Sequence, residues 1–185
     1  MKAIKSVRFY TVFFLLLIVI SSCNHYIDSP RRKSIQVMQG NISFYPDSNV
    51  LVYKTNVNLK QDNEVLKPKS FYTALPKNLL WYEMDNSTSF SFYYNKEQVI
   101  NININSSDAL NGRDTTYIPN QSELDLLINQ PSSSTNAKYD IKKMVSRNGR
   151  KQLIIKKGSA TIWLFNILPK NYNLFVGYLK GFKFL

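Results

Sequence analysis

The chain has little of the chemistry on which most enzymes and metal sites depend. Its 185 residues include one cysteine, Cys23, and one histidine, His25. A single cysteine excludes an intramolecular disulfide, and the position of the histidine leaves none for a Ser-His, Cys-His or multi-histidine site in the rest of the chain. The six glycines are scattered and build neither a P-loop nor a GxGxxG turn. We therefore expect no cofactor, no metal and no enzymatic activity.

Long hydrophobic runs are also scarce, because the one extended apolar stretch covers only residues 9–20. As a helix it would span ~18 Å at ~1.5 Å per residue, well short of the ~30 Å hydrocarbon core of a bilayer. Lys2, Lys5 and Arg8 precede it. A positive start followed by a short apolar core is typical of an export signal. Residues 1–22 are therefore predicted to be a cleaved signal peptide.

The end of this segment carries the most specific motif of the chain. Ile20, Ser21, Ser22 and Cys23 form a branched aliphatic residue, two small residues and a cysteine, which resembles the lipobox of bacterial lipoproteins. The resemblance implies that signal peptidase II cuts before Cys23, that its thiol bears diacylglycerol and that its amine is acylated. Ile20 stands where that family favours leucine, which is expected to slow processing without changing its type. Two or three lipid chains anchor a protein far more firmly than one.

The residues after Cys23 bear on location and partners. No aspartate follows the cysteine directly and no acidic cluster is present, which favours the outer membrane, facing the periplasm. Residues 23–34 are polar and predict a lipidated tether, and residues 35–185 suit one globular domain. The cations at 31–33 either contact anionic headgroups or are solvated. Loss of the signal leaves 21 basic against 12 acidic residues, a charge of +9, which favours an acidic partner but, in an exported protein, not nucleic acid.

The mature chain predicts mainly β-structure, because apolar and polar residues alternate and turn residues separate the segments. Asn148-Gly149 predicts a hairpin turn, since both residues tolerate the positive φ that a type I′ turn requires. Lys157-Gly158-Ser159 and Pro169-Lys170-Asn171 predict the next two turns, giving a four-stranded C-terminal meander. The strands are expected at residues 35–44, 50–58, 87–94, 98–105, 139–147, 150–156, 160–168 and 174–185.

Two helices are expected. Asn120 and Glu123 have the spacing of a capping box and precede an apolar run that Pro131 stops. Residues 69–80 form either a second helix, interrupted by Pro76, or an aromatic loop on the sheet. The predicted fold is α+β, an antiparallel sheet of six to eight strands with one or two covering helices; the alternative is an all-β sandwich. Residues 74–81 and 89–92 resemble the opening of small PsbP-like envelope domains, which have this layout, but no functional residue is carried over.

Candidate sites are few. Asp108 and Asp114 flank Asn111-Gly112, but the spacing does not match an EF-hand calcium loop. Glu83, Asp85 and Glu97 are candidates for an acid/base pair, against the simpler interpretation of solvated surface carboxylates. Aromatic residues offer a groove for a sugar or an apolar ligand, although most are expected in the core. They lie at positions 81, 82, 90 and 92–94, and at 163, 165, 172, 175, 178, 182 and 184.

The most unusual local feature is basic. Residues 138–157 contain eight cations and one carboxylate, Asp140. Arg147, Arg150 and Lys151 are the predicted contacts to an anionic partner, and the simpler interpretation is protection of a sheet edge from aggregation. The sequence thus favours a membrane-anchored envelope lipoprotein that binds another envelope protein, peptidoglycan or anionic lipid. The alternatives are a component of a secretion or transport assembly and a carboxylate-based enzyme.

Overall fold

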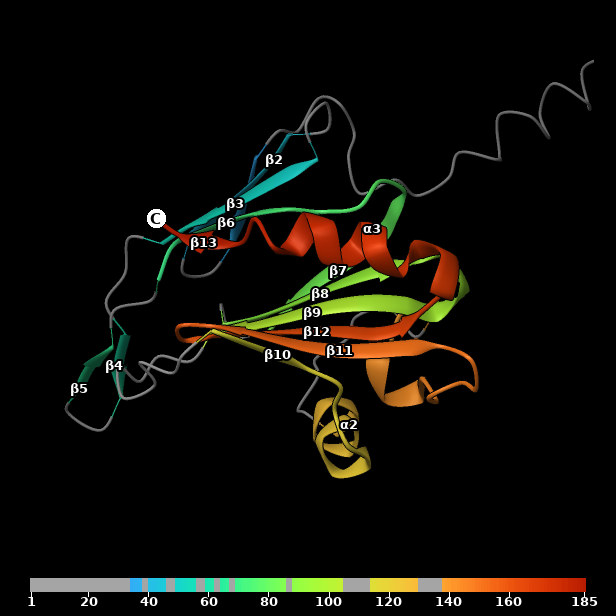
Figure 1. Cartoon of the computed structure of the whole chain (residues 1–185). Coiled ribbons are helices and arrows are strands. Elements are labelled where there is room, and N and C mark those ends of the chain that lie inside the picture. Colours follow the sequence, from blue (N-terminus) through green and yellow to red (C-terminus); the bar gives the residue numbers. More distant parts are fainter. Residues whose placement is uncertain are drawn as a thin grey trace, which may run out of the picture.

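The computed structural model describes residues 34–37, 40–45, 49–55, 59–61, 64–66, 69–85, 88–104, 114–129 and 138–185. These residues form mainly antiparallel β-sheet with two α-helices (Figure 1). The predicted fold class, α+β with covering helices, is confirmed. The strands divide between two large sheets and one small hairpin, so the fold also has the stacked sheets of a sandwich.

The first large sheet has five strands in the order β1-β2-β3-β6-β13. All of its neighbouring strands run antiparallel. Its strands are β1 (Ser34–Val37), β2 (Gly40–Tyr45), β3 (Val50–Lys54), β6 (Phe71–Ala74) and β13 (Lys183–Phe184). A separate two-stranded hairpin lies between β3 and β6 in the chain and consists of β4 (Leu59–Gln61) and β5 (Glu64–Leu66).

The second large sheet has six strands in the order β10-β11-β12-β9-β8-β7, again antiparallel. A 3-10 turn, η1 (Asn95–Glu97), joins β8 to β9 between the strands predicted at 87–94 and 98–105. The strands are β7 (Leu79–Asp85), β8 (Ser89–Tyr94), β9 (Gln98–Ile104), β10 (Thr115–Tyr117), β11 (Lys151–Lys157) and β12 (Ala160–Ile167).

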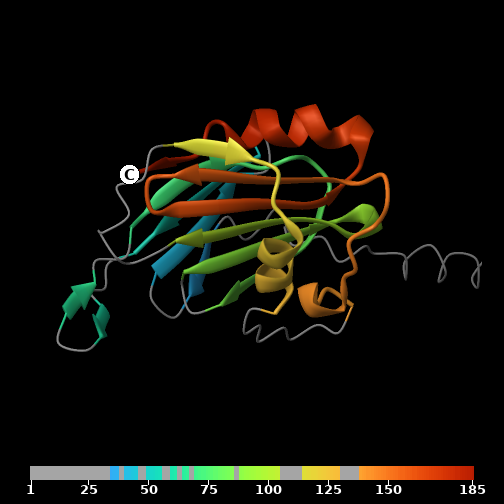
Figure 2. The same ribbon diagram turned by 60° about the horizontal axis from the view of Figure 1, so that its bottom comes forward.

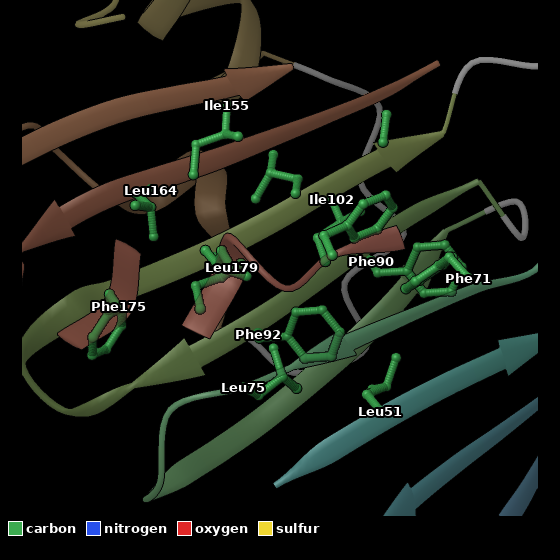
Figure 3. Packing of buried hydrophobic residues seen from close by; sticks show 14 of the residues in the cluster. Leu51, Phe71, Leu75, Phe90, Phe92, Ile102, Ile155, Leu164, Phe175 and Leu179 are labelled. Atoms are coloured by element: carbon green, nitrogen blue, oxygen red, sulfur yellow. The ribbon is translucent and has the colours of Figure 1, made fainter. Parts of the chain in front are cut away.

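The main core lies between the six-stranded sheet on one side and the five-stranded sheet with helix α3 (Pro169–Leu179) on the other (Figure 3). Alternation of side chains along each strand sends Phe90 and Phe92 of β8 into this core, where Phe90 meets Phe71 of β6 edge to face at 5.0 Å. Phe175 and Leu179 close the core from α3. Burial of a side chain of this size contributes ~1.5–3 kcal/mol.

The opposite face of the six-stranded sheet, called the outer face below, is covered in part by α2 (Gln121–Ile128) and a 3-10 turn, η2 (Ile141–Lys143) (Figure 2). Leu124 and Leu127 of α2 and Ile141 of η2 pack there in a second apolar cluster. The predicted capping box of α2 is confirmed, because the side chain of Asn120 accepts from the Glu123 amide at 2.9 Å and Glu123 accepts from the Asn120 amide at 3.0 Å.

The predicted C-terminal meander is wrong in two of its four strands. Residues 139–147 form η2 and irregular chain around it, and β11 pairs with β10 and β12 instead. Only Gly149 of the Asn-Gly pair has positive φ, so the type I′ turn does not form. Ile141 and Met144 are both buried, and their spacing of three fits a helical turn docked on the outer face rather than a strand.

The other predicted strand, residues 174–185, is instead the second half of helix α3, a turn and the two-residue strand β13. Pro169 occupies the first turn, where a missing N–H costs nothing, so it starts this helix rather than ending a strand. Buried Gln98 holds the helix start from β9, because its Oε1 accepts from Leu168 N and from Asn171 Nδ2, each at 3.0 Å. At the other end, Lys157 Nζ donates to the Lys180 and Phe182 carbonyls.

Residues 69–80 form neither the predicted helix nor the aromatic loop. They contain β6 and the start of β7, with alternate burial along β6. Pro76, which would interrupt the predicted helix, lies in the connection between β6 and β7. The chain passes there from the five-stranded sheet to the six-stranded sheet. The segment predicted as one strand, 35–44, is instead a hairpin of β1 and β2.

Candidate functional site

The outer face changes character from one edge of the sheet to the other. A single row of side chains crosses all six strands through adjacent register pairs. Its β10, β11 and β12 members are large and apolar or aromatic, whereas its β9, β8 and β7 members are polar. In strand order, the row reads Tyr117, Ile154, Trp163, Asn101, Ser91 and Glu83.

Glu83 lies at the polar end of this row and is held by two aromatic donors. Trp81 Nε1 donates to its Oε1 at 3.2 Å, and the Tyr93 hydroxyl donates to its Oε2 at 3.1 Å. The ring of Tyr139, which precedes η2, stacks on Trp81 with centroids 5.9 Å apart and an interplanar angle of 10°. Tyr139 also contacts Tyr93, at 5.7 Å. Three aromatic rings and one carboxylate thus form a connected cluster on the outer face.

The Tyr93 hydroxyl stays protonated over the whole physiological range. Burial raises its pKa well above the usual value, and the nearby Glu83 carboxylate raises it further. A neutral hydroxyl beside a carboxylate is a hydrogen-bond donor rather than a base. This arrangement orients the carboxylate and does not prepare the tyrosine for proton abstraction.

Two buried polar atoms in the middle of the row have no hydrogen-bond partner among the residues that the structure describes. They are Asn101 Oδ1, an acceptor, and Trp163 Nε1, a donor, on residues directly opposite each other in β9 and β12. Asn101 is 3% exposed and Trp163 is 8% exposed. The other end of the Asn101 amide is engaged, since Nδ2 donates to Ser91 Oγ at 2.8 Å. An unsatisfied buried polar atom costs about 1–3 kcal/mol, so a neighbouring donor and acceptor in this state are suited to a ligand.

The sequence predicted part of this site. Trp81 and Tyr93 are among the aromatic residues proposed for a groove, and Tyr93 and Tyr94 occupy opposite sheet faces, as adjacent strand residues must. Phe90, Phe92 and Tyr94 belong to the core instead. Asn101 was missed, because an asparagine alternating with isoleucines indicates a solvent-facing position. Only the register between β9 and β12 brings Asn101 beside Trp163.

Two of the three predicted anionic-partner residues have partners within the chain. Arg147 makes a two-pronged ion pair with Glu97, with both N···O distances at 2.6 Å. Arg150 Nη1 approaches the Asn166 carbonyl at 3.5 Å, and Lys151 is exposed at the start of β11. Glu97 was not expected to meet this basic stretch, because it lies 50 positions away from Arg147. The three residues therefore do not form a group of uncommitted cations.

The predicted carboxylate sites do not come together as sets. Glu83 and Glu97 are each bound by different partners, as described above. Asp114 accepts a hydrogen bond from the Gly158 amide at 3.2 Å. Asp108 and Gly112, which belong to the candidate calcium loop, lie outside the described residues. The side chain of Asp85 also lies outside them. Within the described residues, no group of three or more His, Cys, Asp or Glu side chains is arranged to hold a metal ion.

The predicted signal peptide, the lipobox from Ile20 to Cys23 and the tether up to residue 33 also lie outside the described residues. Among the helices that are described, none combines the length and apolar character needed to cross a membrane. No protein-family model, curated protein or solved structure matches this chain.

Proposed function

We propose that this chain is a lipid-anchored, non-catalytic binding module of the bacterial cell envelope. The observation that carries the proposal is the lipobox-like run Ile20-Ser21-Ser22-Cys23 behind a positively charged, short apolar segment. The chain has no second cysteine, and a lipidated thiol removes what would be a reactive group in an oxidising compartment.

The anchor limits where the domain acts. Strand β1 begins at Ser34, eleven positions after Cys23. Eleven residues span at most ~40 Å even when fully extended. A partner must therefore be at the membrane surface or within reach of a domain held close to it, which suits peptidoglycan or another envelope component.

The outer face is the binding face that we favour. Aromatic rings around a fixed carboxylate, next to a buried donor and acceptor without partners, match the needs of a ligand rich in hydroxyl or amide groups. Folding alone gives no reason for the two unsatisfied atoms, because an apolar pair of similar shape would avoid their desolvation cost. Peptidoglycan offers hydroxyl and amide groups in the compartment proposed for this chain.

The anchoring is tested by the substitution Cys23→Ser in cells labelled with a clickable fatty acid. The parent chain is expected to take up label and to run at the size of the cleaved form. The variant is expected to take up none and to accumulate as precursor. Label on the variant would show that the lipobox assignment is wrong.

The binding face is tested by Trp163→Phe, which removes the unpartnered indole N–H and keeps an aromatic ring. Because no hydrogen bond seen in the structure is lost, we expect only the cost of a smaller buried ring, about 1–2 kcal/mol of stability. Co-sedimentation with purified peptidoglycan sacculi should nevertheless weaken. Leu126→Ala is the control, because it shortens an exposed side chain of α2 and leaves the Asn101–Trp163 pair unchanged. Equal sedimentation of parent and Trp163→Phe, or no sedimentation of the parent, would reject peptidoglycan as the ligand of this face.

A further inference from the structure

Charge divides between the layers of the molecule. Among the described residues, β1, β2, β3, β6, β13 and α3 contain no aspartate or glutamate. The described carboxylates lie instead in the six-stranded sheet, in α2, in the segments that join them and in the small β4–β5 hairpin. The layer made of the five-stranded sheet and α3, called the basic layer below, nevertheless carries exposed lysines at 54, 170 and 183.

The surface of the basic layer that points away from the core is largely apolar or aromatic. Along β3 and β6, Leu51, Tyr53, Phe71 and Thr73 are buried, so the alternate residues face outward. One outward row contains Ser43, Val52, Tyr72 and Lys183, and the next contains Tyr45, Val50 and Ala74. Lys183 lies over the Tyr72 ring, with Nζ 5.1 Å from its centroid.

Helix α3 extends this surface. A groove of about 470 Å³ is lined by Ala74 of β6 and by Asn173, Leu174, Gly177, Tyr178 and Gly181 of α3 and its end. Leu174 is 55% exposed, and Lys170 precedes it by one helical turn on the same side. A Cβ at Gly177 would meet no atom within 4 Å, so packing inside the molecule does not require glycine at this interior helix position.

We infer that the basic layer rests on the anionic surface of the membrane that holds the lipid anchor, with Leu174 and the outward rows of the five-stranded sheet at the level of the lipid headgroups. This inference rests on the proposed function, because it takes the anchor at Cys23 as given. It deepens that function by assigning one face of the module to anionic lipid. The occupant is the membrane surface itself, which the lysines attract and the apolar groups contact.

Two independent observations favour the membrane over another occupant. The first is charge complementarity, since an apolar surface bordered by lysines, with no aspartate or glutamate among its described residues, fits anionic headgroups. The second is the attachment point. Cys23 lies only eleven positions before Ser34, the first residue of β1, which is the edge strand of this same sheet. An anchor at this position would therefore hold the basic layer close to the bilayer.

The single native cysteine makes a direct test possible. In the lipidated chain its thiol is blocked, so one introduced cysteine is the only free thiol. We would attach a fluorophore at Ser43→Cys, Leu174→Cys or Leu126→Cys in the full lipidated protein, reconstituted in vesicles of phosphatidylcholine and phosphatidylglycerol. Leu126 is the matched control, because it is also an exposed leucine, at 67%, but lies on α2 across the six-stranded sheet. Lipids with nitroxide headgroups then report proximity by quenching.

The expected result is quenching at positions 43 and 174 that is at least about twofold stronger than at 126, as for side chains held at the headgroup boundary. The contrast should shrink from ~0.1 M to ~1 M salt, because the screening length falls from ~10 Å to ~3 Å. It should also shrink in the triple variant Lys54→Ser, Lys170→Ser and Lys183→Ser. A control triple with the same charge change is Lys96→Ser, Lys143→Ser and Lys151→Ser, which should retain the contrast.

Vesicle flotation separates the two possible failures. If the protein does not float with the vesicles, the anchor and the proposed function fail together. If it floats but the three positions are quenched equally, or position 126 most, the basic layer does not face lipid and this inference is wrong while the anchor stands. Equal loss of contrast in the two triple variants would show that only the net charge matters and not the lysines of the basic layer. That result would overturn the assignment of this layer to anionic headgroups.

Discussion

Replacement of Asn166 is expected to lower the stability of the fold strongly. It is fully buried near the end of β12, in the left-handed region with φ 55°. Its Oδ1 accepts from the Arg147 amide at 3.1 Å and from Gln152 Nε2 at 3.2 Å, and its Nδ2 donates to the Val145 carbonyl at 2.9 Å. One side chain thus fastens the segment after η2 to the end of the six-stranded sheet.

We expect Asn166→Ala to lower the free energy of unfolding by about 4 kcal/mol. Each of the three lost side-chain hydrogen bonds contributes about 1 kcal/mol, and alanine in the left-handed region costs about 1 kcal/mol more. For a domain of this size the melting temperature should fall by roughly 10 °C. Asn166→Gly should recover about 0.5–1 kcal/mol, because glycine adopts this backbone freely but has more entropy to lose on folding.

Guanidinium denaturation followed by circular dichroism and by tryptophan fluorescence measures both variants. Both tryptophans of the chain, Trp81 and Trp163, belong to or pack against the second apolar cluster on the outer face. Tryptophan fluorescence therefore reports on the outer face, while circular dichroism reports on the sheets. Arg147→Ser is the control, since it removes the exposed ion pair but keeps the backbone bond to Asn166, and should cost less than ~1 kcal/mol. The reasoning is refuted if Asn166→Ala costs no more than this control.

Two further predictions concern buried side chains of the main core. Gln98→Leu should cost about 3 kcal/mol in denaturant titrations, because it leaves the start of α3 without its acceptor and the Asn95 carbonyl without its donor; an unchanged midpoint would show that α3 needs no such support. Burial raises the pKa of Tyr94 well above 10, and the charge of Tyr178 raises it further. Because Tyr94 ionises near pH 10 only in the unfolded state, its contribution to stability is complete below pH 10 and is lost as the pH rises above it. Tyr94→Phe should flatten this alkaline loss by up to ~1.4 kcal/mol per pH unit, and an unaltered slope between pH 9 and 11 would contradict it.

The parts of the fold that the sequence predicted correctly depend on local signals. Strands β8 and β9 follow from the alternation of apolar and polar residues, and α2 follows from its capping box. Helix α3 was missed because its start is held by Gln98, a residue 70 positions away from Leu168, rather than by a cap in its own sequence. The Asn-Gly hairpin failed for a related reason, since packing of Ile141 and Met144 on the outer face outweighed the local turn preference.

The candidate site was harder to predict than the fold, because its parts come from separate strands. Trp81, Tyr93 and Glu83 lie on β7 and β8 and are joined through side-chain hydrogen bonds, while Asn101 and Trp163 meet only through the pairing of β9 with β12. Composition can identify aromatic and carboxylate residues, but it cannot say which of them share a sheet face across strands that are far apart in the chain. Register is the missing quantity, and a shift of one residue would turn each side chain to the opposite face.

The two proposed surfaces constrain each other through the layered architecture. The basic layer and the outer face lie on opposite sides of the six-stranded sheet and the main core (Figure 2). If the anchor and the lysines hold the basic layer against the bilayer, the Glu83 cluster and the Asn101–Trp163 pair point away from the lipid, toward whatever polymer or protein lies beyond it. A domain that instead presented its outer face to the membrane would turn this site toward the lipid and away from an envelope polymer. The orientation measured by quenching therefore also decides whether the outer face is free to bind an envelope polymer.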